Sequence, residues 1–124
     1  MARILVSDDD DSVRGLVCRA LALDGHEVEG ACDGAEALEA LGRTDYDLLL
    51  SDIRMPVMDG IALALAAARE RPNLVILLMT GFADQRERAA GLDALIHDVL
   101  TKPFGLSGLR AAVTAALGSR PVAV

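Results

Sequence analysis

Three aspartates, one threonine and one lysine directly follow apolar runs of the sequence. Asp8 and Asp9 follow the first run, Asp52 the third, Thr80 the fourth and Lys102 the fifth. Carboxylate oxygens are the ligands that a hard cation such as Mg²⁺ prefers in proteins. A carboxylate can also act as a nucleophile toward phosphorus and carry an aspartyl phosphate. If these residues meet in the fold, they form a cation site beside a phosphoryl acceptor.

Lys102 is the only lysine among the 12 basic residues of the chain, and all the others are arginine. A lysine is a compact point charge on a flexible stem, which suits neutralisation of a transferred phosphoryl group. The alternative is a solvated lysine without a role. Its position before Pro103, at a strand end that faces the acids, favours a functional interpretation.

The elements that must position these residues follow from the hydrophobic periodicity. Short apolar runs predict strands over residues 3–7, 26–31, 47–51, 74–79 and 97–101. Amphipathic spacing predicts helices over residues 13–24, 34–41, 60–71, 84–92 and 106–117. Alternating strands and helices predict a parallel sheet with right-handed crossovers and helices on both faces. Such sheets place their sites at the carboxyl ends of the strands.

Length and composition indicate one folded domain. The 124 residues are 52% apolar, and the net charge of -7 disfavours nucleic-acid binding. No apolar run has the length of a membrane span, and no signal peptide is recognisable at the start. Cys18 and Cys32 lack metal-ligand spacing and suit free thiols of a reducing cytosol, so we expect a cytoplasmic protein. Residues 1–118 are expected to form the domain, and 119–124 a short tail without an effector domain.

The motifs taken together resemble the receiver domains of response regulators in two-component signalling. They are Asp8-Asp9, Asp52 within Asp-Ile-Arg-Met-Pro-Val-Met-Asp-Gly, Thr80, and Lys102-Pro103-Phe104, in the order and spacing of that family. The resemblance covers nearly the whole chain. It implies a flavodoxin-like (βα)5 fold, which is a doubly wound five-stranded parallel sheet of order 2-1-3-4-5.

The resemblance also implies a role for each site residue. Asp52 would accept a phosphoryl group from a histidine kinase or a histidine phosphotransfer protein. Mg²⁺ would be the cofactor, bound directly by Asp9 and Asp52, largely through water by Asp8, and by the backbone carbonyl of Arg54. Thr80 would move to bond the phosphoryl group, and Lys102 would pair with it.

Three positions depart from the family pattern. Val99 replaces the aromatic residue usually found three positions before the lysine, so the signal needs another readout. The segment Ala94-Leu95-Ile96 replaces a usual Gly-Ala pair, and Asp11 takes a position often held by proline.

Phe82 either covers the core or tunes the access of water to the phosphoryl group. The expected switch and output face is made of Thr80, Phe82, Arg86, Arg88, Val99, Leu106 and Leu109.

Several polar residues have simpler structural interpretations. His26 and His97 lack ligand spacing and are expected to be ordinary strand-edge residues. Asp10 and Asp11 suit the first turn of a helix, where the helix dipole favours acids. Asp59 before Gly60 suits a turn or a helix cap.

The main functional hypothesis is a phosphorylation switch without an output of its own, which acts through a downstream protein. It would not be an enzyme beyond catalysing its own phosphorylation and dephosphorylation. One alternative is a Mg²⁺-dependent phosphatase or phosphotransferase with an Asp nucleophile, and another is a degenerate receiver that binds partners constitutively. A faint likeness to alphaproteobacterial single-domain receivers suggests a regulated-proteolysis adaptor or a phosphorelay component. We expect a monomer or weak homodimer that contacts neither nucleic acid nor membrane.

Overall fold

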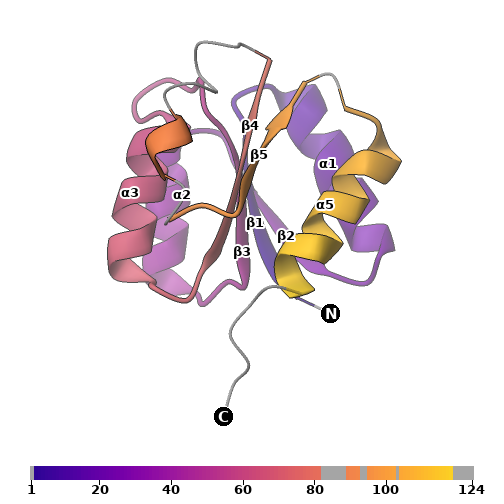
Figure 1. Cartoon of the computed structure of the whole chain (residues 1–124), viewed down its shortest axis with the longest axis horizontal. Coiled ribbons are helices and arrows are strands. Elements are labelled where there is room, and N and C mark those ends of the chain that lie inside the picture. The colour runs from indigo at the N-terminus through magenta and orange to yellow at the C-terminus, as the bar shows by residue number, and fades with distance from the viewer. Residues whose placement is uncertain (1, 82–88, 93–94, 103, 119–124) are drawn as a thin grey trace.

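The computed structural model describes residues 2–81, 89–92, 95–102 and 104–118. Strands and helices alternate along the chain (Figure 1). The strands are β1 (Arg3–Ser7), β2 (Glu27–Ala31), β3 (Leu48–Asp52), β4 (Val75–Thr80) and β5 (Asp98–Thr101). The helical elements are α1 (Asp11–Leu23), α2 (Gly34–Arg43), α3 (Gly60–Glu70), the short 3₁₀ turn η1 (Ala90–Leu92) and α5 (Leu106–Gly118).

The five strands form one parallel sheet in the order β2-β1-β3-β4-β5. This order confirms the predicted flavodoxin-like topology, and the element boundaries lie close to those expected from periodicity. Most of the helix predicted over residues 84–92 falls outside the described residues. Parallel strands all end at the same edge, so the residues that follow them are brought together there.

Two apolar cores lie on opposite faces of the sheet. On β3, Leu49 packs toward α2 and α3, whereas Leu48 and Leu50 pack toward α1 and α5. Figure 1 shows the two helix pairs flanking the sheet. Because successive side chains of a strand point to opposite faces, a continuous apolar run marks a strand that is covered on both sides.

Aspartates begin three of the helices. Asp10, Asp33 and Asp59 are the N-caps of α1, α2 and α3, and each side chain accepts at least one backbone N–H of the first turn. These caps satisfy donors that have no partner within a helix. The expectation for Asp59 is thereby confirmed, and Asp10 and Asp11 do start a helix.

Gly60 lets α3 begin directly against β3. A Cβ atom at this position would lie 2.2 Å from the backbone oxygen of Asp52, which is closer than atoms can approach. Gly60 also donates its N–H to the backbone oxygen of Ile53 at 2.8 Å. The close approach holds the loop that follows Asp52.

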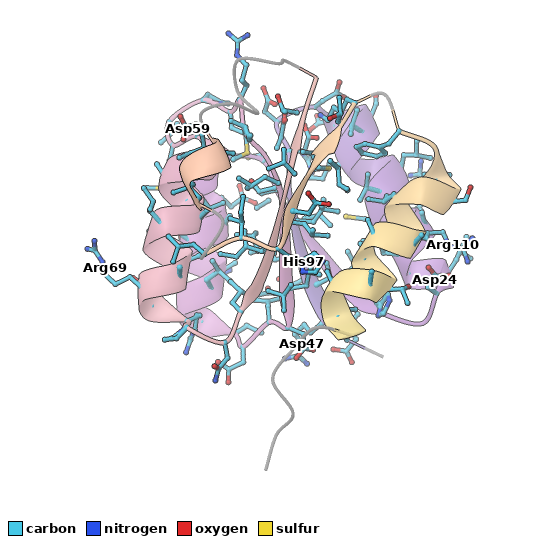
Figure 2. All side chains as sticks on the ribbon, in the orientation of Figure 1. Asp24, Asp47, Asp59, Arg69, His97 and Arg110 are labelled. Carbon is cyan, nitrogen blue, oxygen red and sulfur yellow. The ribbon has the colours of Figure 1, made fainter. Side chains whose placement is uncertain are left out.

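Ordinary polar contacts join neighbouring elements at the end of the sheet remote from Asp52. His26 accepts the backbone N–H of Ala2 through Nδ1 at 3.1 Å, as expected for a strand-edge histidine. Arg110 of α5 donates a forked pair of hydrogen bonds to Asp24, the C-cap residue of α1 (Figure 2). This ion pair joins the two helices that cover one face of the sheet.

Candidate functional site

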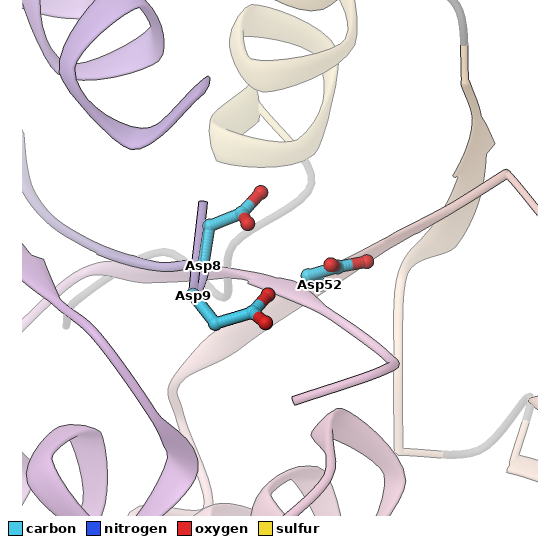
Figure 3. Close-up of side chains that lie close together, drawn as sticks. All are labelled: Asp8, Asp9 and Asp52. Atoms are coloured by element: carbon cyan, nitrogen blue, oxygen red, sulfur yellow. The ribbon is translucent and has the colours of Figure 1, made fainter. Parts of the chain in front are cut away.

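Three carboxylates converge at the carboxyl edge of the sheet. Oxygen atoms of Asp8, Asp9 and Asp52 all lie within 4.8 Å of one another (Figure 3). Asp8 is 0% exposed and Asp52 is 9% exposed, whereas Asp9 is open to solvent. Two buried acids with an exposed third make a cluster that can be entered from one side.

The strand register brings Asp8 and Asp52 together. Ser7 of β1 is paired with Ser51 of β3; Asp8 directly follows Ser7, and Asp52 directly follows Ser51. By alternation, both acids share the face of the sheet occupied by Val6 and the helices α1 and α5. The short spacing between neighbouring strands then forces the two carboxylates close together.

Lys102 supplies the positive charge at this edge. Its Nζ atom lies 3.2 Å from Asp8 Oδ2 and 3.5 Å from Asp52 Oδ2. The side chain is only 25% exposed, so the ammonium group is partly shielded from solvent. One lysine partly offsets the charge of three acids and leaves the cluster negative overall.

The pKa of Asp52 is raised to about 6. Burial is the main cause, because it penalises the charged form of the carboxyl group. The ammonium group of Lys102 opposes this rise, and the negative charges of Asp8 and Asp9 add to it. The shift indicates that the described residues alone do not fully compensate the charge on Asp52.

Thr80 is buried at the end of β4, beside the lysine. Its backbone oxygen accepts the N–H of Lys102 at 2.8 Å, and Thr80 is paired with Thr101 in the sheet. Met79, the preceding residue, is paired with Asp52. The predicted hydroxyl, ammonium and carboxylate groups therefore come from adjacent strand ends.

The four consecutive aspartates divide between two roles. Asp8 and Asp9 belong to the carboxylate cluster. Asp10 caps α1 and donates its own N–H to Asp8 Oδ1 at 3.0 Å, and Asp11 pairs with Arg14 at 2.5 Å. The cap is thus bonded directly to a buried acid of the cluster.

Sequence reasoning missed the anchoring of the loop that follows Asp52. The buried hydroxyl of Ser7 donates to the sulfur of Met55 at 3.1 Å, and the hydroxyl of Ser51 lies 3.9 Å from the same atom. Paired serines at the ends of two neighbouring strands were the available signal.

The loop that follows Asp52 also contains Val57, which has a φ of 70° and is 83% exposed. This residue combines a strained backbone with an apolar side chain in solvent.

Comparison with known proteins decides the family. The family model described as response regulator receiver domain matches residues 4–114. The chain is a response regulator receiver domain. It is 43% identical over 115 residues to the response regulator MprA of Mycobacterium leprae, a match that covers 93% of this chain and 50% of the relative. The chain thus spans about half the length of the curated relatives it matches.

Solved receiver structures share the fold of this receiver domain. The response regulator TrrA of Thermotoga maritima, solved in complex with Mg²⁺-BeF, is 29% identical with a TM-score of 0.84, and the match covers 94% of this chain and 99% of TrrA. The chemotaxis response regulator CheY4 of Vibrio cholerae is 31% identical with a TM-score of 0.85, covering 94% and 98%. A CheY-like receiver domain protein from Methanospirillum hungatei reaches a TM-score of 0.89 at 29% identity, covering 95% and 94%.

The donor set of the receiver domain fits a hard divalent cation. The three side chains offer carboxylate oxygens as ligands. Two of the carboxylate groups, those of Asp8 and Asp52, are held in place by burial, and the cluster carries excess negative charge. Arg54 follows Asp52 by two residues and its side chain is exposed, and the ligand role of its backbone carbonyl stays a prediction. No helix within the described ranges is long and apolar enough to cross a membrane.

The predicted output face of the receiver domain requires one correction. Leu109 is fully buried against the sheet, in the same core as Val113, because it lies on the side of α5 that faces the sheet. It therefore cannot contact a partner directly. Leu106 at the start of the helix is 41% exposed, and Val99 is half-buried against the other core. Phe82, Arg86 and Arg88 lie outside the described residues.

Proposed function

We propose that this receiver domain accepts a phosphoryl group on Asp52 and signals through the resulting change in charge. The carrying observation is the position of Asp52, which is buried among two other acids with Lys102 Nζ at 3.5 Å. Its carboxylate oxygen would form a P–O bond as the P–N bond of a phosphohistidine donor breaks. Receiver domains are phosphorylated by histidine kinases, so the donor is a histidine kinase or a histidine phosphotransfer protein.

Asp8, Asp9 and Asp52, with the backbone carbonyl of Arg54, would hold Mg²⁺. When bound, the ion supplies positive charge that offsets the phosphoryl oxygens. Lys102 would hold a phosphoryl oxygen, since its ammonium group already lies 3.5 Å from Asp52 Oδ2 and 3.2 Å from Asp8 Oδ2. Thr80 would donate its hydroxyl proton to another phosphoryl oxygen, because it ends the strand next to β3.

The switch would act by changing the balance between two conformations. Moving such an equilibrium from mostly off to mostly on takes about 5.5 kcal/mol of differential stabilisation. A few charge-assisted hydrogen bonds from Thr80 and Lys102 to the phosphoryl group can supply energy of this order. The responding surface would include Val99 and Leu106, and the receiver would act on a downstream protein, as a phosphorelay component or a regulated-proteolysis adaptor.

The alternative is a Mg²⁺-dependent phosphatase or phosphotransferase that turns over external substrates. Such an enzyme also needs a carboxylate nucleophile beside a cation, so the cluster alone is compatible with it. The match of residues 4–114 to the receiver family favours the self-limited reaction of a receiver.

Intact-mass measurement after incubation with Mg²⁺ and acetyl phosphate tests the proposal. The expected product is a protein with one phosphoryl adduct, which Asp52→Asn abolishes. Asp45→Asn is the matched control, because Asp45 is an exposed acid outside the cluster that pairs with Arg71. Absence of an adduct on the wild-type protein, or steady hydrolysis of many phosphoesters, would contradict the proposal.

A further inference from the structure

Arg14 reaches from α1 back over the loop that carries the acids. Its Nη1 atom donates to the backbone oxygen of Asp8 at 2.8 Å, and its Nη2 atom donates to Asp11 Oδ1 at 2.5 Å. The side chain is 22% exposed, so the guanidinium group is mostly covered. The planar fork of arginine suits two acceptors that lie side by side.

The Arg14 side chain packs against Gly30 of β2. A Cβ atom at Gly30 would meet Arg14 Cδ at 3.1 Å and both Cγ and Nε at 3.4 Å. A side chain at this position would therefore require the arginine stem to shift by a few tenths of an ångström. Gly30 lies in the strand that directly follows α1, and its contact with Arg14 leaves room for the side chain on its way to Asp8.

The group that Arg14 holds is the peptide unit between Asp8 and Asp9. Asp8 is also fixed by its N–H, which donates to Ala31 at 3.1 Å, and by Asp8 Oδ1, which accepts from Asp10. Asp9 is exposed, and its N–H and Cα atom belong to that peptide unit. The orientation of the Asp8 carbonyl fixes the peptide plane from which Asp9 continues, and it thereby limits the directions open to the Asp9 carboxylate.

We propose that Arg14 is a positioning residue that holds the Asp9 carboxylate toward Asp52 for the divalent cation. This inference rests on the proposed function, because it assigns the cluster to Mg²⁺. Arg14 acts through the Asp8–Asp9 peptide unit and does not touch the ion. Its own positive charge would repel a cation, so charge and positioning predict opposite effects on metal affinity.

Calorimetric titration of the unphosphorylated protein with Mg²⁺ separates the two effects. Positioning predicts that Arg14→Ala raises the Kd for Mg²⁺ about tenfold, as expected when a ligand loses its orienting partner. Charge alone predicts a lower Kd. The matched control is Arg19→Ala, which removes the same charge from an exposed position of α1 and should change the Kd by less than about twofold.

Gly30→Ala tests the same contact without removing the arginine. The added methyl group should displace the Arg14 stem and raise the Kd for Mg²⁺ several-fold. In the Arg14→Ala background the same substitution should have no effect, since the group it displaces is absent. Thermal unfolding without metal confirms that each variant is folded at the titration temperature.

Each outcome decides the inference. A Kd raised by Arg14→Ala and by Gly30→Ala, but not by Gly30→Ala in the Arg14→Ala background, supports it. An unchanged or lower Kd in Arg14→Ala overturns it and leaves the proposed function intact. A wild-type protein that binds no Mg²⁺ overturns the proposed metal site and this inference together.

Discussion

The ammonium group of Lys102 lies 3.5 Å from the carboxylate of Asp52 and 3.2 Å from that of Asp8. Replacing the lysine with methionine keeps the stem and removes the charge. Without metal at pH 7.5, Lys102→Met should lower the free energy of unfolding by about 2 kcal/mol, because two buried acids lose their partner. Urea denaturation measures this. Arg43→Met removes an exposed pair with Glu39 and should cost no more than about 0.5 kcal/mol. Equal losses in the two variants would contradict the pairing.

The raised pKa of Asp52 predicts how stability depends on pH in the absence of metal. The folded-state pKa of about 6 exceeds the ordinary value of 3.8, so folding favours the protonated form. Its contribution to stability is present below pH 3.8 and is lost as the pH rises through about 6. Asp52→Asn should therefore stabilise the protein at pH 7.5, by about 3 kcal/mol more than it does well below pH 4.

Urea denaturation in EDTA at several pH values measures this difference. The stabilisation by Asp52→Asn should fall to about half by pH 5 and almost disappear below pH 4. A stabilisation that stays constant across this range would show that ionised Asp52 does not strain the fold.

Mg²⁺ should stabilise the protein if the three carboxylates bind it. At a concentration about 100 times the Kd, a ligand that binds only the folded state adds about 2.7 kcal/mol. The melting temperature should rise on addition of Mg²⁺ and fall again with EDTA. Asp9→Asn alters only the exposed acid of the cluster and should weaken this response. A melting temperature that EDTA leaves unchanged would count against the site.

Much of this site was predictable because parallel strands end at one edge. The apolar run before Asp52 marks a buried strand, and its neighbour in the sheet carries Asp8, so their meeting follows from topology. The contact between Arg14 and the Asp8 carbonyl was not predictable. It depends on one arginine conformer and on the absence of a side chain at Gly30 of β2. The burial of Leu109 depends likewise on how α5 rotates against the sheet.

Val57 provides a test of strain in the loop that follows Asp52. Its φ of 70° sits within a tight turn in which Met58 donates its N–H to the oxygen of Pro56 at 2.8 Å. A γ-turn of this hand is rare, and a β-branched residue at positive φ is costly. In ordinary extended or helical backbone, glycine destabilises relative to alanine by about 0.5–1 kcal/mol.

At this position the order should reverse. Val57→Gly should be more stable than Val57→Ala by about 1 kcal/mol, because relief of strain, on the order of 1–3 kcal/mol, exceeds the entropic cost of glycine. Loss of the valine side chain contributes little, since it is 83% exposed. Urea denaturation of the two variants gives the comparison directly. If Val57→Ala proves the more stable, the backbone of the turn is not strained at Val57, and the prediction is wrong.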